Sequence, residues 1–77
     1  MPIVVVSGWL PGFKKVAHTE VLQRHAGMSL IAAKSFTERI LAGEQVCFEV
    51  AQWADAVSIA ARLFELGAIA QARTRPD

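Results

Sequence analysis

Residues 46–73, VCFEVAQWADAVSIAARLFELGAIAQAR, decide the fold because they contain two strand patterns separated by one helix pattern. Apolar and other side chains alternate along residues 46–50, which predicts a strand with one apolar face. Residues from about 52 to 66 predict a helix that ends at Gly67, and residues 69–73 can form another strand. Two strands joined by a helix usually lie parallel with a right-handed crossover, which leaves room for a third strand between them.

The residues before this segment supply that third strand and two more helices. Residues 3–6 are a β-branched run typical of a buried central strand, and two glycines and a proline in residues 8–12 predict a loop after it. Helices are predicted at residues 14–26 and at about residues 29–42, with Ser29 as the N-cap of the second.

The prediction is therefore a single α+β domain over residues 1–77, with the element order β-α-α-β-α-β and a frayed tail at residues 75–77. The sheet has three antiparallel strands with the first in the centre, and the three helices pack on one face. The first two helices should turn one side inward, formed by His18, Val21, Leu22 and His25 on one helix and by Leu30, Ala33, Thr37 and Ile40 on the other.

Composition limits the classes of function. The 77 residues are 53% hydrophobic and 19% charged, which excludes a disordered chain and leaves little interior for a deep active-site cavity. A net charge of +1 without a basic run argues against nucleic-acid partners. No stretch approaches the roughly 20 apolar residues of a membrane span, and residues 3–6 are too short for a secretion signal. Because Cys47 is the only cysteine, we expect a reducing, cytoplasmic location.

Catalytic and metal-binding patterns are weak. His18 and His25 lie two helical turns apart, about 10 Å, which is too far for both to bind one metal ion directly. Cys47 lies within a predicted strand, where a buried and inert thiol is the common state. The glycines match no phosphate-binding or dinucleotide-binding loop. We therefore expect no catalytic residue, no cofactor and no metal.

Two aliphatic residues fall on polar helix faces. Val16 shares its face with Glu20 and other polar residues, and Ile31 shares its face with Lys34, so both should be exposed. Apolar side chains surrounded by polar ones are typical of a protein-binding patch. The alternative is that each is an isolated surface aliphatic of the kind that folded proteins commonly carry.

Two further groups of apolar residues leave alternatives open. Trp9 and Leu10 could be loop anchors for a partner, or they could fold back with Phe13 to fill the gap between sheet and first helix. The third helix has an apolar arc wider than one sheet face covers. Its residues Trp53, Val57 and Phe64 either pack over the sheet edge or form a homodimer contact.

Small and apolar residues recur through nearly the whole chain, in Lys15-Val16-Ala17, Gly27-Met28-Ser29-Leu30, Ala33-Lys34, Glu38 and Ala54 to Ala68. At these positions the chain resembles the C-terminal domain of the bacterial ribosomal stalk protein. The resemblance implies the same fold and partner contacts through the first two helices, where Lys15, Val16, Ala17 and Lys34 match the family's contact positions. Glu20, Gln23 and Ile31 stand where that family has basic residues.

A second resemblance lies in Glu20-Val21-Leu22-Gln23, Met28-Ser29 and Val46-Cys47. There the chain is similar to the Clp protease adaptor that recognises N-degrons. The adaptor's acidic and amide pair is replaced by Ser7-Gly8-Trp9-Leu10, and its histidine by Ile40-Leu41. Both resemblances imply a binding module.

The sequence thus predicts a non-enzymatic protein–protein interaction module, adaptor-like or inhibitor-like, that docks a partner protein through its first two helices. A structural or assembly role as a homo-oligomer through the third helix is the alternative. The predicted partner-binding residues are Trp9, Leu10, Lys15, Val16, Glu20, Ile31 and Lys34, and the possible dimer contacts are Trp53, Val57 and Phe64.

Overall fold

The computed structural model describes residues 1–74 and contains the six predicted elements in the predicted order. They are β1 (Ile3–Trp9), α1 (Lys15–His25), α2 (Leu30–Leu41), β2 (Val46–Glu49), α3 (Trp53–Glu65) and β3 (Ala68–Arg73). The three helices begin and end within about one residue of their predicted bounds. The predicted frayed tail at residues 75–77 lies outside the described residues.

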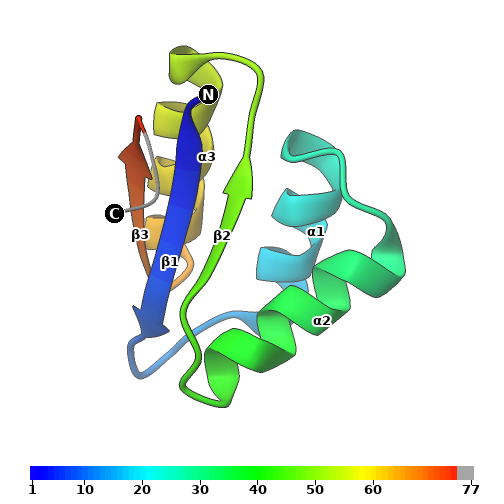
Figure 1. Ribbon diagram of the computed structural model, residues 1–77. Helices are drawn as coiled ribbons and strands as arrows, with labels where there is room; N and C mark the ends of the chain where they lie inside the picture. The colour runs from blue at the N-terminus through cyan, green and yellow to red at the C-terminus, as the bar shows by residue number, and fades with distance from the viewer. Residues whose placement is uncertain (75–77) are drawn as a thin grey trace.

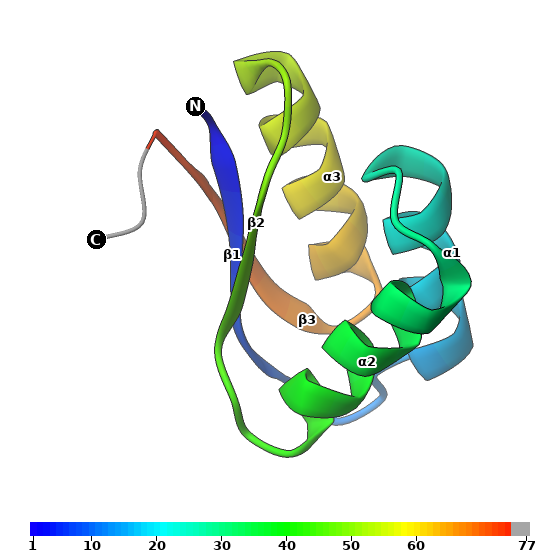
Figure 2. The ribbon, with the colours of Figure 1, turned by 45° about the vertical axis from the view of Figure 1, so that its right-hand side comes forward.

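The strands form one antiparallel sheet in the order β2-β1-β3, with β1 in the centre (Figure 1). Val4 marks the register, because it pairs with Phe48 of β2 and with Ala72 of β3. All three helices lie on the same face of this sheet, as the turned view in Figure 2 shows. The predicted α+β fold, with the first strand central, is confirmed.

β1 is longer than predicted. The sequence prediction ended the strand before Gly8, but the pairing of β1 with β3 continues through Gly8 and Trp9. A register shift between Val6 and Gly8 leaves Ser7 out of the ladder, so the two strands absorb an extra residue and go on pairing. Trp9 therefore belongs to a strand and not to a loop.

The core lies between the sheet and the three helices. α3 packs on β1 and β3, α2 packs on β1 and β2, and α1 packs against α2 and α3. The largest wholly buried apolar side chains come from all three helices and the central strand, and they are Leu22, Ile40, Ile59, Leu63, Val4 and Val6.

Three residues predicted to be buried are exposed. Leu30, in the first turn of α2, is 48% exposed, while Met28 just before the helix packs against the core. His25 lies exposed in the last turn of α1. Cys47 is also exposed and not buried, because Val46 and Phe48 on the edge strand β2 face the core and leave Cys47 on the sheet face without helices.

The predicted N-cap of α2 is present. Ser29 Oγ accepts a hydrogen bond from the Ala32 backbone N–H at 3.2 Å. We expect Ser29→Ala to lower the free energy of unfolding by about 1 kcal/mol, measured by urea denaturation, because one amide loses its partner. Ser35→Ala, at an exposed position within the same helix, should cause no loss. Equal effects of the two changes would contradict the capping role.

Candidate functional site

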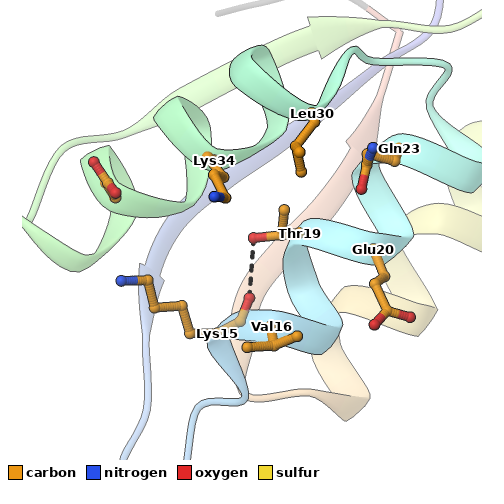
Figure 3. A pocket seen from close by; sticks show the side chains of 8 residues that line it. Lys15, Val16, Thr19, Glu20, Gln23, Leu30 and Lys34 are labelled. Atoms are coloured by element: carbon orange, nitrogen blue, oxygen red, sulfur yellow. Dashed lines mark hydrogen bonds between the residues drawn. The ribbon is translucent and has the colours of Figure 1, made fainter.

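A groove runs between α1 and α2, with a volume of about 380 Å³ (Figure 3). We refer to it as the α1/α2 groove. Its lining comes from only these two helices: Lys15, Val16, Thr19, Glu20 and Gln23 from α1, and Leu30, Lys34 and Glu38 from α2.

The periodicity of the two helices explains why these residues meet. Positions three or four apart lie on the same side of a helix. The groove residues of α1 follow this spacing from Lys15 to Gln23, and those of α2 are four apart from Leu30 to Glu38. Four predicted partner-binding residues, Lys15, Val16, Glu20 and Lys34, are thereby brought together.

Large aliphatic side chains lie in and beside the groove. Val16 is 73% exposed and Ile31 is 82% exposed, which confirms the exposure predicted for both. Val16 lines the groove, whereas Ile31 follows the lining residue Leu30 and is not itself part of the lining. Leu30 is a site residue that the sequence prediction missed, because its spacing matched the inner stripe of α2.

Charges of both signs line the groove, and Glu38 follows Lys34 by one turn of α2, on the side away from Leu30. Figure 3 shows Lys15 and Lys34 toward one end and Glu20 and Gln23 toward the other. Within residues 1–74, the only ion pair at 4 Å or less joins Arg39 and Glu44, away from the groove. The charged groups of the groove are therefore free to pair with a partner.

A buried polar cluster holds α1 and α2 together beneath the groove. Thr37 Oγ1 donates a hydrogen bond to the Ala33 carbonyl oxygen at 2.9 Å. The same hydroxyl lies 2.9 Å from His18 Nδ1 and 3.1 Å from Thr19 Oγ1. Thr19 also lines the groove, so this cluster connects the core of the helix pair to its surface.

The cluster favours one tautomer of His18. When the single Thr37 hydroxyl hydrogen is donated to the Ala33 carbonyl oxygen, His18 Nδ1 carries a proton and donates it to Thr37. His18 Nε2 is then the unprotonated nitrogen, and it has no hydrogen-bond partner among the described residues. Burial lowers the pKa of His18 from 6.5 to about 4. A neutral imidazole is thus a structural part of the α1–α2 contact.

Trp9 and Leu10 are partly exposed and partly packed, so each of the two predicted alternatives, exposed anchor or filler of the gap beside the first helix, holds in part. Each is nearly half exposed, and neither lines the α1/α2 groove. The Trp9 ring lies 6.3 Å from the Phe13 ring, which in turn lies 5.0 Å from the His18 ring. The Leu10 backbone N–H donates to the Gly67 carbonyl oxygen at 2.8 Å. This segment therefore packs on the start of α1 while part of it stays accessible.

The predicted dimer contacts on α3 are uncovered. Trp53 is 49% exposed, Phe64 is 60% exposed, and Val57 is nearly half exposed. Val57 and Phe64 line a hollow between α3 and β3, and none of the three residues lines the α1/α2 groove. The α1/α2 groove and the exposed side of α3 are thus separate surfaces, and both carry exposed apolar side chains.

No protein-family model matches the chain, and no curated protein matches it. The resemblance to the stalk and adaptor families stays a prediction. No helix within residues 1–74 combines the length and apolar character that crossing a bilayer requires.

Proposed function

We propose that this protein is a non-enzymatic interaction module that binds another protein in the α1/α2 groove. The observation that carries the proposal is the exposure of Val16 and Ile31 on neighbouring helices that also form a groove. Single exposed aliphatics are ordinary on protein surfaces, but several beside one groove form a contact that only an apolar partner surface would cover well.

The charges of the groove indicate the chemistry of the partner. Lys15 and Lys34 can pair with acidic groups of a partner, and Glu20 and Glu38 can pair with basic groups. Beside these charges, Val16 and Leu30 favour apolar side chains. The partner segment is therefore amphipathic, with charged groups of both signs beside apolar side chains. Both resembled families are binding modules, which supports the same function, and a cytoplasmic location fits it.

The test is capture from a lysate of the source organism, with bound proteins measured by quantitative mass spectrometry. Changing Val16 and Ile31 to Asp together should reduce the captured partner about tenfold or more, because two charges would enter an apolar contact. Leu10→Asp is the matched control, since Leu10 is exposed outside the groove and should leave capture unchanged.

Circular dichroism should show that all variants remain folded. If the Val16 and Ile31 changes leave capture intact, the groove is not the docking site. Loss of capture in Leu10→Asp alone would move the site to the segment between β1 and α1.

A structural or assembly role as a homo-oligomer is the second candidate. The exposed apolar side chains on α3 favour it, since they lie away from the α1/α2 groove.

A further inference from the structure

α3 carries an uncovered apolar stripe along the side that borders β3. Its residues are spaced three or four apart, so they lie on one helix face: Trp53, Val57, Ala61 and Phe64. None of them is charged, and all four are exposed. A hollow of about 370 Å³ runs between this stripe and the residues 70–72 of β3. We refer to these four residues as the α3 stripe.

β3 is an edge strand. It pairs with β1 on one side, and no strand of the described residues lies on its other side. An edge with unpaired backbone groups is a template for another strand. Ala70 and Ala72 on its core-facing side are small, so a neighbouring strand could approach without steric conflict. The α3 stripe and this free edge are adjacent, because both line the same hollow.

A single two-fold axis can relate both the α3 stripe and the edge of β3 to their counterparts in a second copy. The centre of the α3 stripe lies between Ser58 and Ile59. Its distance along the helix axis from Glu65, the end of α3, is about 10 Å at roughly 1.5 Å per residue. The strand from Ala68 to Gln71 also spans about 10 Å, at roughly 3.3 Å per residue. α3 and β3 are joined by a short turn, so the centre of the α3 stripe lies level with Gln71. An axis beside Gln71 therefore brings two copies of β3 and two copies of α3 together at once.

The α3 stripe is complementary to itself about that axis. In an antiparallel pair of α3 helices, Trp53 lies opposite Phe64 of the second copy, and Val57 lies near the level of its exposed Ala61. Large side chains thus meet at the two ends, and small ones allow close approach in the middle. No charge faces a like charge, since Glu65 falls opposite Gln52.

The pairing of two β3 strands obeys the same symmetry. With the axis beside Gln71, Ala70 lies opposite Ala72 of the second copy, and Ile69 lies opposite its Arg73. Residues directly opposite each other then point to the same sheet face, as antiparallel pairing requires. The helices of both copies stay on one face of a continuous sheet.

The α3 stripe is too small to form a stable dimer interface without the edge of β3. Trp53 and Phe64 each expose on the order of 100 Å² of apolar surface. The α3 stripe alone therefore falls well short of the roughly 800 Å² per partner of a standard interface. The adjoining edge of β3 extends the contact and adds directional hydrogen bonds.

We infer that a second copy of this chain covers the α3 stripe and the free edge of β3, forming an antiparallel homodimer with one continuous sheet. This inference deepens the second candidate function, the homo-oligomer through α3, and does not rest on partner binding in the α1/α2 groove. In Figure 1, β3 lies at the edge of the sheet away from α2, so the dimer leaves both α1/α2 grooves open. Such a dimer would present two docking sites to its partner.

Sedimentation equilibrium over a concentration series tests the dimer. The intact chain should dissociate reversibly, and Phe64→Glu should raise the dissociation constant about 30-fold or more, because a charge would replace the aromatic ring that packs on Trp53 of the second copy. Ile31→Glu is the matched control, since Ile31 is an exposed apolar residue on α2, outside the α3 stripe, and should leave the dissociation constant unchanged. Circular dichroism of each variant checks that it is folded.

Disulfide trapping tests the strand pairing. In a Cys47→Ser background, Gln71→Cys places two cysteines directly opposite each other, with Cα atoms about 4.5–5.5 Å apart. Mild oxidation should then link the two copies. Ser35→Cys in the same background lies on α2 and should not form a link.

A monomer at every concentration would overturn the inference, as would a dimer that Phe64→Glu does not weaken. A dimer that Phe64→Glu weakens, but that Gln71→Cys does not trap, would overturn the continuous sheet.

Discussion

Lowering the pH from 7 to 5 is expected to reduce the free energy of unfolding by about 2 kcal/mol through His18 alone. The unfolded chain has an ordinary histidine pKa of about 6.5, whereas burial lowers the pKa of His18 in the folded protein to about 4. Between these values the unfolded state binds more protons, so stability falls as the pH falls, by about 1.4 kcal/mol per unit. The effect is absent above pH 6.5 and complete below pH 4.

The geometry around His18 explains why the folded protein resists protonation. A second proton would sit on Nε2, which is buried and has no hydrogen-bond acceptor among the described residues. The measurement is urea denaturation at pH 7, 6 and 5, for the wild type and for His18→Leu. Carboxylates contribute equally to both proteins, so the difference in slope isolates His18. Equal slopes would show that His18 is not buried in its neutral form.

Helical and strand periodicity was enough to predict the element order and the central position of β1, because one covered sheet face imposes clear patterns. The end of β1 could not be predicted in the same way. Gly8 suggested a loop, but Gly8 pairs with Ile69 and Trp9 pairs with Ala68, which lie far away in the chain. Long-range pairing of this kind overrides a local turn signal.

Exposure was predicted correctly for apolar residues with polar neighbours on their helix face, and wrongly for Leu30 at the start of α2 and Cys47 on an edge strand. Val16 and Ile31 lie among polar neighbours on their helices, so helical spacing placed them on the surface correctly. Leu30 has the spacing of a core residue, but the first turn of α2 leaves it exposed. Cys47 lies on an edge strand, where only one flank and one face are covered. The spacing of residues along a helix or strand predicts the direction in which a side chain points. It does not predict whether another element covers that side chain.

The polar cluster beneath the groove shows the same limit. Spacing placed both His18 and Thr37 on inward faces, and both are fully buried. Their hydrogen bond depends on how α1 crosses α2, which no pattern within either helix contains. The cluster links stability to the site, because Thr19 belongs to it and lines the groove. Acidification should therefore loosen the helix pair that forms the groove.

Gly67→Ala is expected to lower the free energy of unfolding by about 3 kcal/mol or more, measured by urea denaturation. Gly67 has a φ of +99°, which strains any residue with a Cβ. A Cβ there would also lie 2.9 Å from Phe13 Cα and 3.3 Å from Phe13 N. These are backbone atoms, so they cannot move aside as a flexible side chain could, and overpacking adds to the strain.

Gly43→Ala separates the two causes. Gly43 has a similar φ of +91°, but nothing lies within 4 Å of an added Cβ, so this change should cost only about 1 kcal/mol of strain. The excess in Gly67→Ala then measures the close approach to Phe13, and equal losses would contradict it. The turn at Gly67 also holds the start of α1, since Leu66 O accepts a hydrogen bond from the Lys14 backbone N–H at 2.9 Å. Gly67→Ala should therefore displace Lys15 and Val16 and weaken partner capture, while Gly43→Ala should leave capture unchanged.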